Sequence, residues 1–191
     1  MEALQKILHE KFNVTEEEWR IISPYVKLQA LEKGEFFIEE NKICRSSAFI
    51  LEGVAHYFNY DKNGNAPTCY FSYEGHYAVD PFTFASQAPA KINLQAVTRC
   101  RLAVISYESD KKLGAIFPRW SEIATQALLQ VSMEFANQKE LVSMNASERY
   151  DYFIKQYPHL AKRVPLHYVA SYLGVAQPSL SRLRKNAGLK K

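Results

Sequence analysis

The feature that most constrains the fold is a series of short apolar runs between residues 26 and 107. The runs are a few residues long and are separated by turn-forming residues, including Gly34, Gly53, Gly64 and Gly75. Short strands at this spacing are typical of an antiparallel sandwich or barrel. The segment DKNGN lies between two strand-like runs and predicts a hairpin turn. The segment YAVDPFTFASQAPA lacks strand character and predicts a short helical or looped excursion.

Helical patterns flank this region on both sides. Residues 3–12 predict a short helix, and VTEEEW forms a capping box, with Thr15 as cap and Glu18 reaching back, that starts a second helix. From residue 118 to 145 apolar residues recur at alternating helical steps. Such a seam favours pairing with a second copy of the helix, the alternative being packing on its own barrel alone. The predicted dimer interface consists of Ala124, Leu128, Val131, Phe135, Gln138 and Val142.

The charge distribution separates the C-terminal segment from the rest of the chain. Residues 152–191 contain eight Lys or Arg and no Asp or Glu, so all 20 acidic residues precede them, against 16 of the 24 basic ones. A basic segment on an acidic body indicates a polyanionic partner for that segment, the alternative being a solvated basic tail. Across the start of this segment, SERYDYFIKQYP predicts a helix with Ser147 as its cap, ended by Pro158.

The stretch VPLHYVASYLGVAQPSLSRLRK predicts two helices joined by a tight turn. Pro165 suits the first turn of the first helix, Gly174 suits a left-handed C-cap, and a second helix covers 177–186. Apolar residues at the inward positions complete the pattern of a helix-turn-helix. Outward Arg and Gln side chains suit base edges, and Ser and Lys suit phosphates. The predicted DNA contacts are Gln177, Ser179, Ser181, Arg182, Arg184 and Lys185, with His167 from the first helix; the alternative for each is a solvated surface residue.

The segments ERYDYFIKQYPHLAKRVPLHYVASYLGVAQPSLSRLRK, FILEGVAHYF and TRCRLAVIS together resemble the Crp/Fnr family of bacterial transcription regulators. The resemblance implies an α+β fold: an N-terminal cyclic-nucleotide-binding-type β jelly roll, a long dimerisation helix and a C-terminal winged helix-turn-helix. It implies a homodimer that reads a palindromic operator in double-stranded DNA, with RNA polymerase as a further candidate partner. The corresponding domains are 1–117, 118–145 and 146–191. The last predicted helix ends within NAGLKK, which leaves the presence of a wing open.

The resemblance breaks down at the effector site. Members that bind cyclic AMP hold its phosphate with a Gly-Glu pair and a later Arg-Ser or Arg-Thr pair, where this chain has Val79-Asp80 and Ala90-Lys91. Ala90 lacks the guanidinium fork, and Lys91 offers only a point charge. We therefore expect no cofactor and no cyclic AMP bound in that mode, and leave an unknown small-molecule effector open. The candidate pocket residues are Tyr70, Val79, Asp80, Phe82, Ala90 and Lys91, the alternative for the aromatic ones being core filling.

Other chemistries lack the residues that they need. Cys44, Cys69 and Cys100 have no metal-ligand spacing and are expected to be reduced and mostly buried, and the late position of the first excludes an N-terminal iron–sulfur group. His56 and His76 are expected to be strand or surface histidines rather than haem ligands. A cupin-type metal enzyme needs several converging His residues, which EGVAHYF does not offer. We expect no metal and no catalytic residues.

No apolar run has the length of a membrane span, and the charged N-terminus has no signal core, so a cytoplasmic protein is expected. The alternative to a DNA-binding regulator is a barrel-type small-molecule sensor, or a cupin-like metal protein, without a DNA role.

Overall fold

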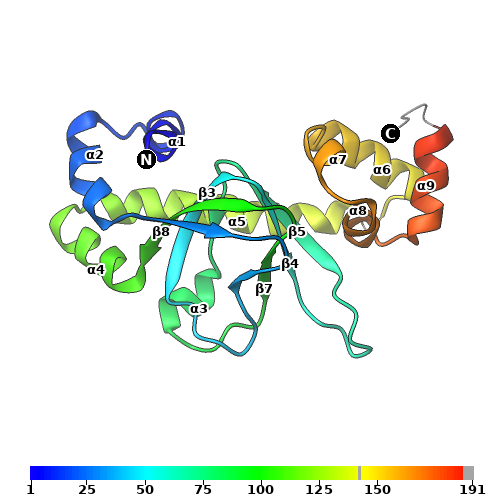
Figure 1. Cartoon of the computed structure of the whole chain (residues 1–191), viewed down its shortest axis with the longest axis horizontal. Helices are drawn as coiled ribbons and strands as arrows, with labels where there is room; N and C mark the ends of the chain where they lie inside the picture. Colours follow the sequence, from blue (N-terminus) through cyan, green and yellow to red (C-terminus); the bar gives the residue numbers. More distant parts are fainter. Residues whose placement is uncertain (142, 187–191) are drawn as a thin grey trace. The chain divides into compact units, whose positions relative to one another are not determined.

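The structure is a computed structural model that describes residues 1–141 and 143–186, with the side chains at 134, 137–140 and 186 outside the description. The chain divides into two compact units (Figure 1). The first unit comprises Met1–Tyr57 and Phe71–Met133, and the second comprises Phe58–Tyr70 and Glu134–Lys191. The predicted division into a barrel, a helix and a C-terminal domain stays a prediction.

Strands in the described residues form two four-stranded sheets, ordered β1-β8-β3-β6 and β2-β7-β4-β5. The pairs β1–β8, β3–β8, β3–β6 and β2–β7 are antiparallel. Two sheets with this order form a jelly roll, so the predicted antiparallel sandwich is confirmed. The strands are β1 (Lys27–Leu31), β2 (Phe36–Ile38), β3 (Ser46–Glu52), β4 (Val54–Phe58), β5 (Thr68–Tyr73), β6 (Tyr77–Ala78), β7 (Asn93–Ala96) and β8 (Cys100–Ser106).

The jelly roll encloses an apolar core in which β4 is buried along its whole length. Tyr57, Phe49 and Trp120 are among the largest fully buried side chains of the first unit. The turn between β3 and β4 requires glycine. Gly53 has φ 102°, and a Cβ there would lie 2.3 Å from the carbonyl oxygen of Arg99. No other residue fits this approach without moving the backbone.

Two helices precede the sheets, as predicted: α1 (Glu2–Phe12) and α2 (Glu16–Ile22), followed by the 3-10 turn η1 (Ser23–Tyr25). The capping box of α2 is present: the Glu18 N–H donates to Thr15 Oγ1 over 3.3 Å, and the Thr15 N–H donates to Glu18 Oε2 over 2.8 Å. The Arg119 guanidinium also binds the Glu18 carboxylate and donates to the Phe12 carbonyl. The Arg119 hydrogen bond is the main reason that the pKa of Glu18 is lowered.

The excursion predicted within the barrel contains α3 (Pro81–Ser86) after the short strand β6. After β8 the structure adds a helix that the sequence patterns did not predict, α4 (Tyr107–Ile116), whose N-cap hydroxyl on Ser106 accepts the Ser109 N–H over 3.1 Å. The helix predicted over 118–145 is α5 (Arg119–Leu141).

The second unit contains the hairpin between β4 and β5 and four helices: α6 (Ala146–Gln156), α7 (Leu160–Arg163), α8 (Leu166–Leu173) and α9 (Gln177–Asn186). The predicted Ser147 cap of α6 is wrong. Asn145 is the N-cap, because its Oδ1 accepts the N–H groups of Ser147 and Glu148, and Glu148 reaches back to the Asn145 N–H over 2.7 Å. The stronger Asn–Glu capping box places the start of the helix two residues earlier.

Candidate nucleic-acid interface

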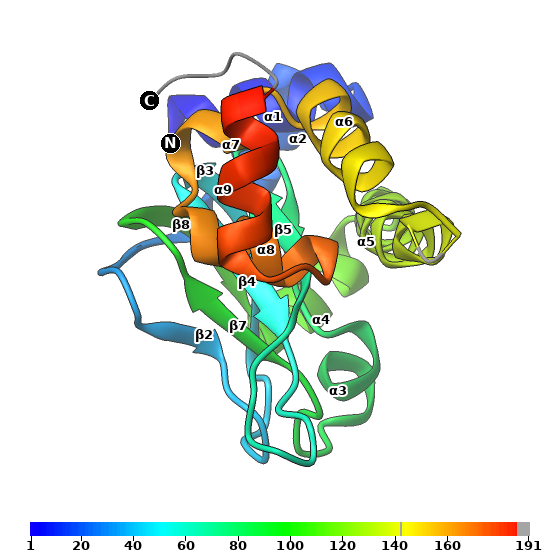
Figure 2. The ribbon, with the colours of Figure 1, turned by 90° about the vertical axis from the view of Figure 1, so that its right-hand side faces the viewer.

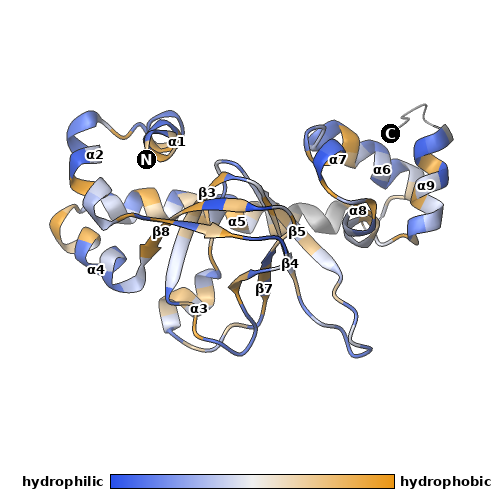
Figure 3. Ribbon diagram, viewed as in Figure 1, coloured by the Kyte–Doolittle hydropathy of each residue, from blue (hydrophilic) through white to orange (hydrophobic). Residues whose placement is uncertain are grey.

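The C-terminal site is built on α8, a tight turn and α9. Gly174 ends α8 with φ 63°, the left-handed C-cap expected of it, and α9 begins at Gln177. Val169, Ala170 and Leu173 on α8 and Leu180 on α9 are buried. Apolar residues at these spacings fix one face of each helix to the other and leave the opposite face of α9 to solvent. Figure 3 shows this division on α9, where hydrophilic and apolar segments alternate.

Arg149 on α6 holds the turn in place, a role that sequence patterns did not indicate. Its Nη1 donates to the carbonyl oxygen of Leu173, the last residue of α8, over 2.8 Å, and its Nε donates to the carbonyl of Met144 over 3.0 Å. The last carbonyls of a helix lack partners within the helix, so a guanidinium there satisfies a group that the turn would otherwise leave exposed. A Cβ on Gly174 would lie 3.2 Å from the same Nη1.

The predicted DNA-contacting side chains divide into an exposed set and an inward one. His167, Gln177, Ser181, Arg182 and Lys185 are exposed, and Ser179 is half-buried. Figure 2 looks directly onto α9, and no other described element of its unit lies in front of it. Arg182 is loosely held, with its Nη2 3.4 Å from Ser179 Oγ.

Arg184 differs from these residues because it is half-buried against α6. It lines a small hollow with Tyr150 and Phe153, and its guanidinium hydrogen-bonds the Tyr150 hydroxyl. Burial raises the pKa of Tyr150, and Arg184 partly offsets that rise. The position of Arg184 suits packing of α9 on α6 better than contact with a phosphate.

The hairpin between β4 and β5 also contacts α8. The backbone N–H of the buried Thr68 donates to Ser171 Oγ over 2.9 Å. Pro67 and Cys69 of the hairpin line a hollow of about 300 Å³ together with Arg149 and the C-terminal end of α8. The hairpin turn itself matches the prediction, because Asp61 Oδ1 accepts the N–H groups of Asn63 and Asn65.

The predicted effector residues differ in their exposure and in the unit to which they belong, and their role stays a prediction. Val79 and Ala90 are fully buried, Phe82 is 66% exposed, and Lys91 is exposed. Tyr70 is buried in the second unit, whereas the others lie in the first.

Backbone N–H groups between residues 79 and 83 are hydrogen-bonded to side chains of the protein itself. The Tyr57 hydroxyl accepts the Val79 N–H over 2.9 Å and donates to the Val79 carbonyl over 3.0 Å. The Asp80 carboxylate accepts the N–H groups of Phe82 and Thr83 at the start of α3. Both sets of donors are therefore already satisfied within the protein.

The predicted dimer seam on α5 stays a prediction, and its residues differ in burial within the chain. Val131 is buried within its own chain, together with Ile123 and Ala127, so this face of the helix already has a partner. Phe135 is half-buried, and its ring lies 5.5 Å from that of Tyr70. Ala124 and Leu128 are half-buried, and the side chains of Gln138 and Val142 lie outside the description. Among the described side chains of α5, the large apolar ones that are exposed are Leu129 at 57% and Met133 at 66%.

In the described part of the chain, no group of three or more His, Cys, Asp or Glu side chains is placed to hold a metal ion. His56 is buried with its Nε2 3.4 Å from Gln95 Oε1, and His76 Nδ1 accepts the Tyr73 N–H over 3.3 Å. None of the helices within the described ranges has the length and apolarity to cross a membrane.

Comparison with known proteins gives structural relatives only. Neither the protein-family models nor the curated protein sequences contain a match. Among solved structures, the c-di-GMP-responsive global regulator CLP of Xanthomonas campestris aligns with a TM-score of 0.71 at 13% identity, over 88% of this chain and 89% of that one. FixK2 of Bradyrhizobium japonicum aligns with a TM-score of 0.71 at 13% identity, over 85% and 84% of the two chains.

A third structure, of a protein from Eubacterium rectale assigned to the Crp/Fnr family of transcriptional regulators, aligns with a TM-score of 0.69 at 11% identity, over 93% of this chain and 85% of that one. The chain shares the fold of Crp/Fnr-type transcription regulators. The structural neighbours therefore confirm the expected resemblance to Crp/Fnr regulators at the level of the fold, including the cyclic-nucleotide-binding-type sheets.

Proposed function

We propose that the protein is a dimeric, sequence-specific DNA-binding transcription regulator of the Crp/Fnr type. The observation that carries the proposal is the free face of α9, which presents Gln177, Ser181, Arg182 and Lys185 from a segment without acidic residues. A helix with such side chains fits the major groove, where Arg and Gln bind base edges bidentately. Arg184 is left out of the contact set, since it is engaged with Tyr150.

A DNA selection with the purified protein tests the proposal. We expect a palindrome with half-sites about one helical turn apart, and Arg182→Ala should weaken binding to that site by about 1–3 kcal/mol. Lys155→Ala, an exposed basic residue on α6, is the charge-matched control and should leave sequence preference intact. Binding should weaken steeply with salt. If the selection enriches no sequence and DNA affinity does not change with salt, the alternative of a barrel-type sensor without a DNA role is favoured.

The proposed homodimer uses the exposed side of α5. Leu129 and Met133 are exposed although they are large and apolar, and an apolar helix stripe of this kind suits a second copy of the same helix. Leu129→Asp and Met133→Asp should convert a dimer into monomers in analytical ultracentrifugation. Gln130→Asp, on an exposed polar position of the same helix, should leave the dimer intact. Monomeric wild-type protein at all concentrations would contradict this part of the proposal.

We also propose that the regulator takes no cyclic AMP at the segment 79–91. Ala90 is buried and carries no guanidinium, and Tyr57 and Asp80 already occupy the nearby backbone donors. Calorimetric titration with cyclic AMP should give no heat of binding and no change in DNA affinity. A cytoplasmic location and a role without catalysis belong to the same proposal.

A further inference from the structure

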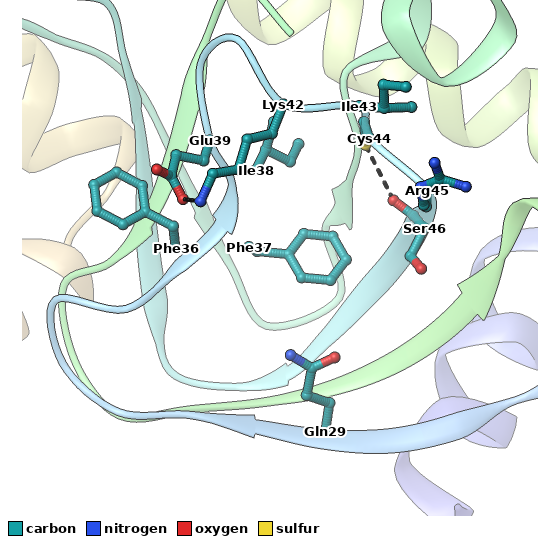
Figure 4. Close-up of a pocket in the computed structure, with 10 residues that line it drawn as sticks. All are labelled: Gln29, Phe36, Phe37, Ile38, Glu39, Lys42, Ile43, Cys44, Arg45 and Ser46. Atoms are coloured by element: carbon teal, nitrogen blue, oxygen red, sulfur yellow. Dashed lines mark hydrogen bonds and ion pairs between the residues drawn. The ribbon is translucent and has the colours of Figure 1, made fainter. Parts of the chain in front are cut away.

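A hollow in the first unit is lined by none of the residues predicted to contact DNA or an effector. It has a volume of about 310 Å³ and opens where the edge strands of the two sheets, β1 and β2, come close (Figure 4). Its walls are Gln29 on β1, Phe36–Ile38 on β2, and the connection from Glu39 to the start of β3 at Ser46. The volume lies at the lower end of the range of small-molecule sites.

The lining of the hollow is mixed, with polar side chains around a central aromatic ring. Figure 4 shows the Phe37 ring near the middle of the lining residues, with Gln29 on one side and Arg45 and Ser46 on another. Phe37 is half-buried and Ile43 is 40% exposed, so these apolar surfaces remain open to a ligand. A ring face of this kind attracts a planar aromatic group.

The charges around the hollow do not balance. Lys42 Nζ lies 2.6 Å from Glu39 Oε2, so the charges of these two side chains balance each other. Arg45 is exposed, and within the described residues its guanidinium makes no hydrogen bond or ion pair, as is also true of the side chains of Gln29 and Ser46. The hollow therefore offers one uncompensated cation and two neutral hydrogen-bonding groups. A carboxylate is the natural complement of a guanidinium, which can donate two parallel hydrogen bonds to it.

One wall of the hollow is tied to the segment after α3. The Asn41 N–H donates to the Ala90 carbonyl and the Ala90 N–H donates to the Lys42 carbonyl, both over 2.8 Å. Gln87 Nε2 donates to the Cys44 carbonyl over 3.2 Å. A molecule seated against residues 42–46 thus rests on the same backbone that supports the loop containing Ala90.

We propose that this hollow binds a small planar aromatic carboxylate, with the ring against Phe37 and the carboxylate at Arg45. Gln29 and Ser46 supply the neutral hydrogen bonds that orient it. The proposal concerns ligand binding by the first unit and does not depend on DNA binding, so each is tested without the other.

The test is a titration of the isotope-labelled full-length protein with benzoate, followed by amide NMR shifts, with benzamide as the neutral probe of the same shape. Benzoate should shift the amides of residues 29, 36–38 and 42–46, and benzamide should bind more weakly. Arg45→Gln should weaken benzoate binding roughly five- to tenfold, as for a partly exposed charged pair. Arg20→Gln, an exposed arginine on α2, is the matched control and should bind benzoate as the wild type does.

Three results would overturn the proposal: no shifts with benzoate, equal binding of benzoate and benzamide, or equal binding by the Arg45 and Arg20 variants. Shifts confined to residues 79–91 would also overturn it, because they would place the ligand in the family's usual effector segment instead. The amide spectra of the variants report directly whether each is folded.

Discussion

Tyr57→Phe removes a single oxygen atom from the centre of the jelly roll and leaves the shape of the side chain almost unchanged. In the wild type that hydroxyl bonds both backbone groups of Val79, and neither residue is exposed to solvent. Two net hydrogen bonds are worth about 1 kcal/mol each, and a buried N–H that loses its acceptor costs about 1–3 kcal/mol. We expect the free energy of unfolding to fall by about 2–4 kcal/mol and Tm to fall by roughly 5–15 °C.

Urea denaturation followed by circular dichroism measures this change. Tyr60→Phe is the control, because Tyr60 is 54% exposed. Its free energy of unfolding should lie within about 0.5 kcal/mol of that of the wild type. If Tyr57→Phe is as stable as the Tyr60 variant, the hydroxyl does not anchor Val79 and the reasoning about the occupied donors is wrong.

Three further perturbations test other contacts. Ser171→Ala should speed hydrogen exchange of the Thr68 amide roughly fivefold or more, because about 1 kcal/mol of hydrogen bonding is lost; Ser147→Ala, on an exposed helix position, should not, and equal exchange in both would refute the contact. Arg119→Gln should lower Tm at pH 7 and have less effect near pH 3. The fold lowers the pKa of Glu18, so the stability that the ionised Glu18 carboxylate contributes is lost as the pH falls from its unfolded pKa through its folded pKa. An equal loss of Tm at both pH values would contradict the ion pair. Burial raises the pKa of Tyr57 and Tyr77 above the usual value of about 10, so stability should fall as pH rises above that value, and by less in Tyr57→Phe than in the wild type, in alkaline denaturation.

The periodicity of the sequence predicted the elements whose patterns are local. The short apolar runs predicted the antiparallel strands, Thr15 and Glu18 predicted the start of α2, and Gly174 predicted the end of α8. Each of these signals acts over a few residues. The cap of α6 was misplaced because Asn145 and Ser147 are both good caps, and only the reach of Glu148 back to position 145 decides between them. Helix α4 was not predicted because Ser106, its N-cap, is also the last residue of the strand-like run RLAVIS.

The side chains that shape the candidate sites come from distant parts of the sequence, and no spacing rule connects them. Arg149 lies 24 residues before the carbonyl that it binds, and Tyr57 lies 22 residues before Val79. The sequence also leaves open which residues of α5 form the dimer seam, for a related reason. A helical stripe shows that an apolar face exists, but whether the barrel or a second chain covers it depends on which face the fold turns inward.

The hairpin between β4 and β5 makes a contact of this kind with α8, 103 residues further along the sequence. Residues 58–70 belong by sequence to the jelly roll, yet they cluster with the C-terminal helices, and Thr68 is hydrogen-bonded to the helix that precedes the turn. The two strands of this hairpin continue into the first unit, where β4 contains Tyr57 and β5 continues beyond Tyr70. Tyr57 directly precedes this segment, and Thr68 follows Tyr57 by eleven residues along the hairpin, so a shift of Tyr57 relative to Val79 can reach Thr68 through the chain. Tyr57→Phe should accordingly change the exchange of the Thr68 amide as well as global stability, and an unchanged Thr68 amide in that variant would show that the route carries no coupling.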